Sequence, residues 1–272
     1  MSATLASPEP FRGRVTQTRV ARSEWTKLWS LRSTRWSLLA AVASMGGLGL
    51  IIAAVQLGRW NTLDPHDRAT FDSIDIGVSG YHLAQLAIGV LGVLVISGEY
   101  STGMIRSSLM AVPKRLPVLW AKLGVFCAVT FALMLAATFT SFFGVQAIVS
   151  SHHVQHSLGD PHALRAIVGT ALFLTALGAM CVGLGALVRN TAGGIAAFVG
   201  LLFVLPGITA LLPASTGDAV EPYLPLNAGT TVASSTFDNP HHLSTWAGFG
   251  VFCAYTAVIV AAAAVRLARA DA

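Results

Sequence analysis

A polar stretch from Ser97 to Lys122 carries side chains that could make specific charged contacts. It lies between two long apolar runs and holds five charged residues, Glu99, Arg106, Lys114, Arg115 and Lys122. Residues 102–110 leave room for a short helix that Thr102 could cap and Pro113 would stop. Met104, Ile105, Ser108 and Leu109 would share one face of this helix. That face has nothing of its own to pack against, so we expect another protein to bury it.

Two other groups of residues have the chemistry of metal ligands. His152, His153 and His156 could share a helical face that binds a metal or senses pH. No carboxylate is spaced as a clear co-ligand, so we favour the interpretation that they are polar loop residues. Three cysteines (Cys127, Cys181, Cys253) each lie inside an apolar run, and their spacing matches no zinc pattern. We therefore expect neither a metal nor a cofactor.

Motifs for catalysis and nucleotide binding are absent from the sequence. It contains no Gly-x-x-x-x-Gly-Lys-Ser/Thr loop, no His-Glu-x-x-His and no Gly-x-Ser-x-Gly. The chain is therefore not expected to be an enzyme, and it cannot cradle ATP by itself. No apolar run has an ionisable residue near its middle, which weakens the hypothesis of an ion-coupled carrier.

The composition indicates a membrane protein. Of the 272 residues, 54% are hydrophobic and 11% are charged, whereas a soluble domain carries about 25% charged residues. The net charge of +5 does not indicate nucleic-acid binding, because the basic residues lie beside apolar runs and form no continuous stripe.

Six apolar runs are long enough to be membrane-spanning helices, since about 20 residues cross about 30 Å of hydrocarbon. They are residues 36–57, 81–96, 117–149, 163–188, 192–212 and 246–267. The third is longer than one crossing needs, and Pro206 predicts a kink or break near the end of the fifth. The predicted fold is an all-α polytopic membrane protein, with a six-helix transmembrane domain over residues 36–272. The segment 213–245 is either an ordinary loop or a set of short helices.

The distribution of Lys and Arg predicts the orientation of the spans. Fourteen of these residues fall on one side of the six runs and three on the other. The richer side should be cytoplasmic, so both termini are expected in the cytoplasm of a multi-pass protein of the cytoplasmic membrane.

The segment 15–35 is predicted to be a separate amphipathic helix at the inner membrane interface. Ala21, Trp25, Leu28, Trp29 and Arg32 recur at helical spacing, and the two tryptophans suit the headgroup region. A solvated basic extension is the alternative. Residues 1–14 contain no apolar core, so we expect a disordered tail and no signal peptide.

Three blocks of sequence resemble the actinobacterial group of type-2 ABC exporter permeases. They are SEWTKLWSLRSTRW at 23–36, GEYSTGMIRSSL at 98–109 and LPLNAG at 224–229. The resemblance implies a transmembrane subunit that pairs with an identical or different second permease and with two separately encoded ATPases. It also implies an inner amphipathic helix at 15–35 and a coupling helix at 102–110, where Met104 stands in place of the Thr of many relatives. Substrates of such exporters include drugs, antibiotics, lipids, glycans and ions.

These observations lead to the hypothesis of alternating access driven by the partner ATPases. The helix at 102–110, with Thr102, Met104, Ile105 and Leu109, would transmit their motion to the second and third spans. Glu99 and Arg106 would make polar contacts at that joint, or else be ordinary interfacial charges. Two alternative functions remain, a secondary transporter and a membrane anchor or immunity protein that transports nothing.

Overall fold

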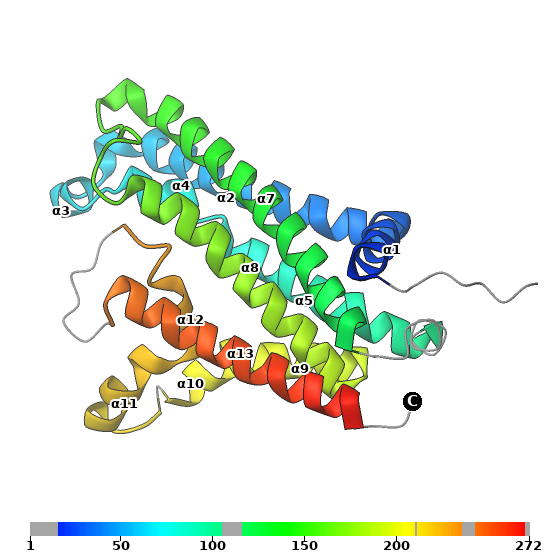
Figure 1. Ribbon diagram of the computed structural model, residues 1–272. Helices are drawn as coiled ribbons and strands as arrows, with labels where there is room; N and C mark the ends of the chain where they lie inside the picture. The colour runs from blue at the N-terminus through cyan, green and yellow to red at the C-terminus, as the bar shows by residue number, and fades with distance from the viewer. Residues whose placement is uncertain (1–15, 105–115, 210, 236–242, 270–272) are drawn as a thin grey trace, which may run out of the picture.

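The computed structural model describes residues 16–104, 116–209, 211–235 and 243–269 (Figure 1). The predicted tail at 1–14 lies outside these ranges. So does most of the predicted coupling helix, including Ile105, Arg106 and Leu109.

The protein is an all-α polytopic membrane protein, as predicted. Among the described residues, six helical segments are long and apolar enough to cross a membrane. They are formed by α2 (Arg32–Gly58), α5 (Tyr81–Ser101), α7 (Leu116–Val149), α8 (Ala163–Val188), α9 to α10 (Thr191–Thr209) and α13 (Thr245–Arg269). The predicted boundaries of the fourth span agree with those of α8. Helix α7 is roughly 50 Å long at about 1.5 Å per residue, more than one crossing requires.

Helix α8 is the centre of the bundle. It packs against α5, α7 and α13. Of the residues in its most apolar 18-residue stretch, 61% are buried inside the protein, compared with 28% for α2 and 22% for α13. Phe173, Leu177 and Met180 of α8 are fully buried in the main core. The helices around α8 expose apolar side chains outward, as expected for a bundle surrounded by lipid.

The fifth span changes its helical geometry before its proline. Helix α9 (Thr191–Val199) is followed by the π-helical segment η3 (Gly200–Val204) and then by α10 (Leu205–Thr209). Pro206 has no backbone N–H to donate, and a wider turn just before it accommodates the ring and the missing bond. The predicted irregularity is therefore present, as a π turn preceding Pro206.

Short elements join the spans at one end of the bundle (Figure 1). Between α2 and α5 these are η1 (Trp60–Thr62), α3 (Pro65–Ala69) and α4 (Ser73–Val78). The others are η2 (Ser150–His152) after α7 and, after α10, α11 (Ala214–Val220), η4 (Glu221–Tyr223) and α12 (Pro225–Thr230). The segment 213–245 thus contains short helices, and α12 packs against α13.

Helix α1 (Gln17–Ser30) lies at the opposite end of the bundle, with the C-terminal ends of α5 and α13 (Figure 1). The predicted helix at 15–35 is divided, because Leu31 has extended backbone angles (φ −84°, ψ 123°) and α2 begins at Arg32. Residues 32–35 therefore belong to the first span. Leu31 lets the chain change direction between the two helices.

Candidate functional site

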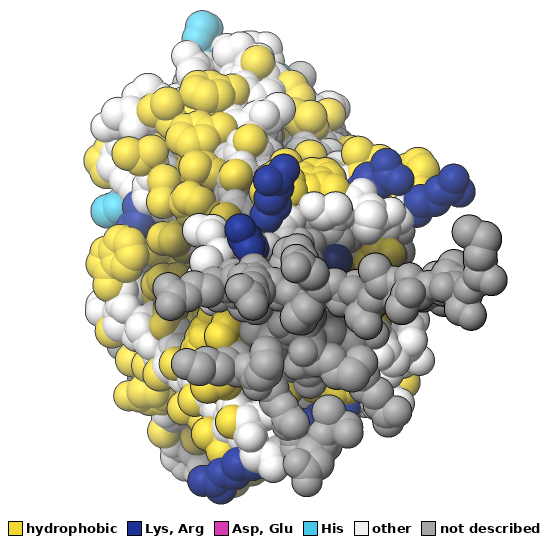
Figure 2. Space-filling view, turned by 45° about the vertical axis from the view of Figure 1, so that its right-hand side comes forward, with side chains coloured by type: hydrophobic (Ala, Val, Ile, Leu, Met, Phe, Trp, Pro, Cys, Tyr) yellow, Lys and Arg dark blue, Asp and Glu magenta, His cyan; other side chains and the backbone are white. Residues whose placement is uncertain are grey.

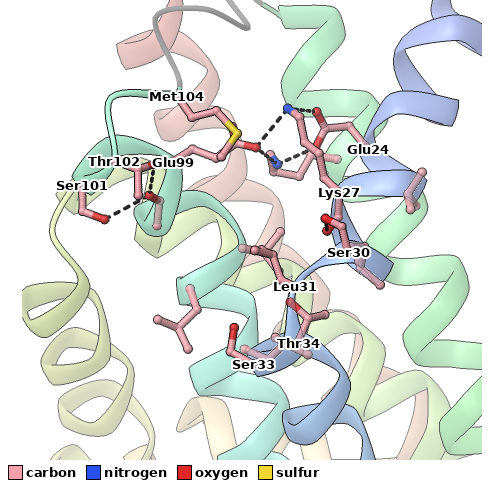
Figure 3. Close-up of a pocket in the computed structure, with 17 residues that line it drawn as sticks. Glu24, Lys27, Ser30, Leu31, Ser33, Thr34, Glu99, Ser101, Thr102 and Met104 are labelled. Carbon is pink, nitrogen blue, oxygen red and sulfur yellow. Dashed lines mark hydrogen bonds and ion pairs between the residues drawn. The ribbon is translucent and has the colours of Figure 1, made fainter.

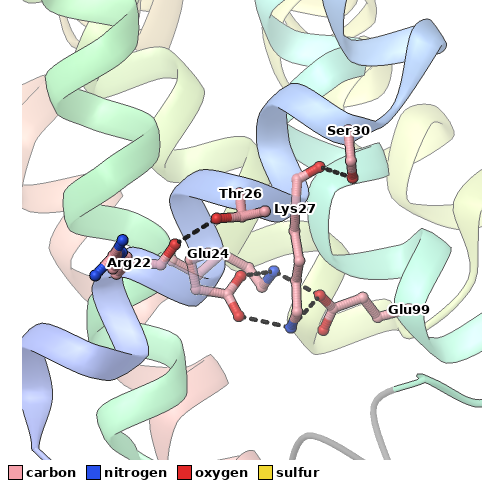
Figure 4. A network of polar contacts seen from close by, with 7 residues as sticks. Arg22, Glu24, Thr26, Lys27, Ser30 and Glu99 are labelled. Atoms are coloured by element: carbon pink, nitrogen blue, oxygen red, sulfur yellow. Dashed lines mark hydrogen bonds and ion pairs between the residues drawn. The ribbon is translucent and has the colours of Figure 1, made fainter.

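Four charged side chains meet where α1, α5 and α7 come together. Glu24 and Lys27 come from α1, Glu99 from the last turn of α5 and Lys122 from the second turn of α7. Glu24, Glu99 and Lys122 are 5%, 6% and 4% exposed, so these charges lie inside the protein. We call these four residues the ion network (Figure 4).

Each lysine of the ion network bridges both glutamates. Lys122 Nζ lies 2.5 Å from Glu24 Oε2 and 2.9 Å from Glu99 Oε1. Lys27 Nζ lies 2.7 Å from Glu24 Oε1 and 3.1 Å from Glu99 Oε1. The network joins three helices that are far apart in the sequence, and it carries no net charge.

The contacts of Lys27 favour its charged form. Burial by itself would lower the pKa of Lys27, but the hydrogen bonds and charges of Glu24 and Glu99 outweigh burial and raise it. Buried charges are costly unless each is paired and hydrogen-bonded. A change that removes one charge leaves another buried without its partner, so the network links α1, α5 and α7 to one another.

Apolar contacts support the same junction. Val20 of α1 is buried with Val118 and Ala121 of α7, and the Gln17 side chain donates to the Pro117 carbonyl at 3.1 Å. Trp25 and Trp29 project away from this contact, at 49% and 38% exposed. Helix α1 therefore has one face against the bundle and another that presents both tryptophans outward.

The structure places three of the predicted coupling residues at this junction. Glu99 belongs to the ion network. Thr102 is the C-cap of α5, and its hydroxyl donates to the Gly98 carbonyl at 2.8 Å; the helix that it was expected to cap lies largely outside the described residues. Met104 is 42% exposed and lines the same pocket as Glu99 and Thr102 (Figure 3).

Sequence reasoning did not assign Glu24, Lys27 or Lys122 to a site, although signals for two of them were present. Glu24 is the one acidic residue of the basic segment 15–35. Lys122 lies inside an apolar run, where an ammonium group needs a partner. The identity of the partners follows only from the three-dimensional packing, because Glu24 and Lys122 are 98 residues apart.

The surface around this junction is basic. Figure 2 shows Lys and Arg side chains gathered at this end of the molecule, and no Asp or Glu is visible among the residues drawn in colour. Exposed arginines at this end include Arg22, Arg32, Arg35, Arg266 and Arg269. Such a surface suits an anionic partner or an anionic membrane face.

A second polar cluster lies at the opposite end. Asp72 caps α4 by accepting from the backbone N–H of Ile74 at 2.7 Å, and it also accepts from the Ser235 hydroxyl. Asp75 accepts from the Ser235 backbone N–H at 2.7 Å. Arg165 of α8 donates to the carbonyls of Ser234 and Ser235 at 3.0 and 3.1 Å. These bonds fix the chain after α12 against α4 and α8.

The candidate metal-binding histidines occupy different surroundings. His152 packs on the ring of Trp60, with 5.1 Å between the ring centroids, whereas His156 Nδ1 lies 2.8 Å from the Ser73 hydroxyl. Only His152 belongs to a helical element, so the three histidines do not share one helical face. Within the described ranges, no cluster of three or more His, Cys, Asp or Glu side chains could hold a metal ion.

The fold and the site define a polytopic membrane protein with six candidate spans among the described residues and a charged junction where two of them meet an additional N-terminal helix. A family profile described as ABC-2 family transporter protein matches residues 71–272, more than half of the chain. The chain therefore belongs to the ABC-2 transporter family, whose permeases work with an ABC ATPase. No curated protein and no solved structure matches the chain.

Proposed function

We propose that this chain is the permease subunit of an ATP-driven exporter in the cytoplasmic membrane, close to the actinobacterial group that its motifs resemble. It pairs with a second permease, identical or different, and with two copies of an ATPase subunit. ATP hydrolysis takes place on the ATPases, and this chain provides the path through the membrane. Both termini, α1 and the connection between α5 and α7 face the cytoplasm, and Trp25 and Trp29 anchor α1 at the inner interface.

The observation that carries this proposal is the ion network, which lies where α5 ends and α7 begins. Glu99 lies three residues before the C-cap of α5, and Lys122 lies six residues after the start of α7. An ATPase that displaced the segment 102–110 would therefore move two spans whose ends are bonded to each other and to α1. Because interfaces of this kind are bistable, a small displacement can be amplified into a change between two arrangements of the bundle.

Docking through Met104 and Ile105 can be tested with the double substitution Met104→Asp and Ile105→Asp. A carboxylate buried in an apolar socket without a partner costs several kcal/mol, and about 1.4 kcal/mol is tenfold in affinity. The variant should insert in the membrane but lose export and co-purification of the ATPase. Met104→Leu with Ile105→Val keeps the face apolar and is the matched control. Normal ATPase binding and export by the Asp variant would contradict docking through this face.

The orientation can be tested with single-cysteine tags in intact cells. Tags at Asp64, Gly159 and Gly217 should react with an impermeant reagent added outside, whereas tags at Gly13, Lys114 and Ala272 should not. The prediction follows from the excess of Lys and Arg on one side, and the structure has α1 and the end of α13 at one end of the bundle. Reaction of the Lys114 tag in intact cells would contradict the predicted orientation.

The two alternative functions predict different responses of transport. A secondary transporter would be inhibited by an uncoupler and unaffected by an inactive ATPase. An anchor or immunity protein would act with the ATPase gene deleted. The proposed exporter should lose transport both when the ATPase is inactive and when the ATPase gene is deleted.

A further inference from the structure

A pocket of about 300 Å³ opens beside the ion network, between α1, the start of α2, and α5 (Figure 3). Its apolar wall includes Leu28, Leu91, Leu94 and Val125, and its polar part includes all four residues of the ion network. Its volume is at the lower end of the range for small-molecule sites, about 300–1,000 Å³. A site with an apolar wall and a charged part suits the polar end of an amphiphile.

Glu99 gives this pocket an acceptor that the protein leaves unused. Its Oε1 accepts from both lysines, but its Oε2 is buried and has no hydrogen-bond partner among the described residues. A buried carboxylate oxygen without a donor costs free energy that a bound donor would recover. The terminal torsion of a glutamate is soft, so a small rotation of the carboxylate presents Oε2 to a ligand in the pocket.

The first turn of α2 contributes the complementary charge. Leu31, Ser33 and Thr34 line the pocket, and α2 begins there with no side-chain cap and no acidic residue in its first turn. The N–H groups at the start of a 27-residue helix favour a phosphate, because they point outward from the positive end of the helix dipole. The pocket therefore has an unused acceptor in Glu99 and the start of a long helix in its lining.

We propose that this pocket binds the headgroup of a phosphatidylethanolamine-type lipid from the surrounding leaflet. The primary ammonium donates to Glu99 Oε2, the phosphate lies at the first turn of α2, and the glycerol end contacts Leu91 and Leu94. The headgroup is a zwitterion, so it adds no net charge to a network whose two glutamates and two lysines already balance. A choline headgroup has no N–H to donate, and a glycerol headgroup adds a net negative charge beside Glu99. This site does not depend on the proposed ATPase, and its test does not require transport.

The test uses the full-length chain, purified and delipidated in detergent, with native mass spectrometry as the readout. Phosphatidylethanolamine, phosphatidylcholine and phosphatidylglycerol with identical acyl chains are added separately at equal concentration. Phosphatidylethanolamine should bind about tenfold more tightly than phosphatidylcholine, the effect of one charge-assisted hydrogen bond. Equal binding of phosphatidylethanolamine and phosphatidylcholine would overturn the proposal, and so would a preference for phosphatidylglycerol that the substitution Leu94→Phe, which fills the pocket, abolishes.

Two variants place the lipid in this pocket. Glu99→Gln should reduce phosphatidylethanolamine binding to the level of phosphatidylcholine. Leu94→Phe fills the pocket and keeps the ion network, so it should also abolish the preference for phosphatidylethanolamine. This variant tests the site even if Glu99→Gln fails to fold. Leu83→Phe is the control, because Leu83 is 48% exposed on the same helix and does not line the pocket. A preference that survives in Leu94→Phe would show that the lipid binds elsewhere. Soluble glycerophosphoethanolamine that competes as well as the lipid would show that the occupant is not a lipid.

Discussion

The two ends of the bundle hold charged side chains against different kinds of partner, and among the described residues only the end with α1 has glutamates and a lysine that are buried. At the junction of α1, α5 and α7, the carboxylates and ammonium groups of the ion network bond to one another across three helices. At the opposite end, Asp72, Asp75 and Arg165 bond largely to backbone groups of short connecting segments. In the first arrangement, moving one helix strains its bonds to two others. In the second, side chains fix a loop onto helices that are already packed.

The two ends therefore differ in how easily they can rearrange: we call the end with α1 a joint and the opposite end a fastening. Side-chain pairs between helices can re-form in a second register when the helices shift, because both partners are long and flexible. A loop held by its own carbonyl and N–H groups has fewer alternatives, since its backbone must keep its bonds satisfied. The end with α1 is therefore suited to transmit motion, and the opposite end is suited to remain in place.

The largest effect is expected from Lys122→Met in the ion network. It leaves two buried glutamates with Lys27 as their cationic partner within the network, and breaking a buried pair costs about 3–5 kcal/mol. The variant should melt at a markedly lower temperature in detergent. Adding Glu99→Gln should recover much of the loss, because the Glu24–Lys27 pair then balances by itself. Arg22→Met, at an exposed position of α1, is the control for loss of one positive charge. A Lys122→Met variant as stable as Arg22→Met would mean that the network does not hold the three helices.

A smaller and more local effect is expected from Arg165→Met at the opposite end. The substitution removes two bonds to the carbonyls of Ser234 and Ser235 and one to the Thr245 hydroxyl at 3.2 Å. Hydrogen bonds to a charged group contribute about 1.5–3 kcal/mol. Hydrogen exchange should therefore accelerate at residues 231–235 while α5 and α7 keep their protection. Arg59→Met, at an exposed position of the same end, should change neither. Faster exchange throughout the bundle would show that the bonds of Arg165 hold more than the loop at this end.

The sequence predicted the spans well because their signal is local. A run of about 20 apolar residues specifies a crossing without reference to its neighbours, and so the bounds of α8 were predicted correctly. The division at Leu31 and helix α4 were missed for the same reason. Leucine is an ordinary helix residue, so nothing in the sequence marks the extended backbone of Leu31. The segment Ser73–Val78 is too short to show a helical period.

The candidate site was only partly predictable. Glu99 was singled out because it lies in a polar segment between two spans, and the structure pairs it with Lys27 and Lys122. A lysine inside an apolar run and a lone acid on a basic helix each indicate a partner, but neither identifies it. That information comes from the packing of α1 against α7, which depends on small apolar contacts such as Val20 with Val118.

The smallest effect is expected from Ser73→Ala, also at the end opposite α1. Ser73 is fully buried, and its hydroxyl lies 3.1 Å from Gln146 Oε1 and 2.8 Å from His156 Nδ1. Gln146 Oε1 still accepts from the His156 backbone N–H at 2.8 Å, and Gln146 Nε2 still donates to the carbonyl of residue 73 at 3.3 Å. The loss should therefore be about 1 kcal/mol, that of one hydrogen bond, seen as a small fall in melting temperature. Ser151→Ala, at an exposed position of the same end, should have less effect. A loss as large as that of Lys122→Met would show that this end also depends on one buried polar group, and the contrast between joint and fastening would fail.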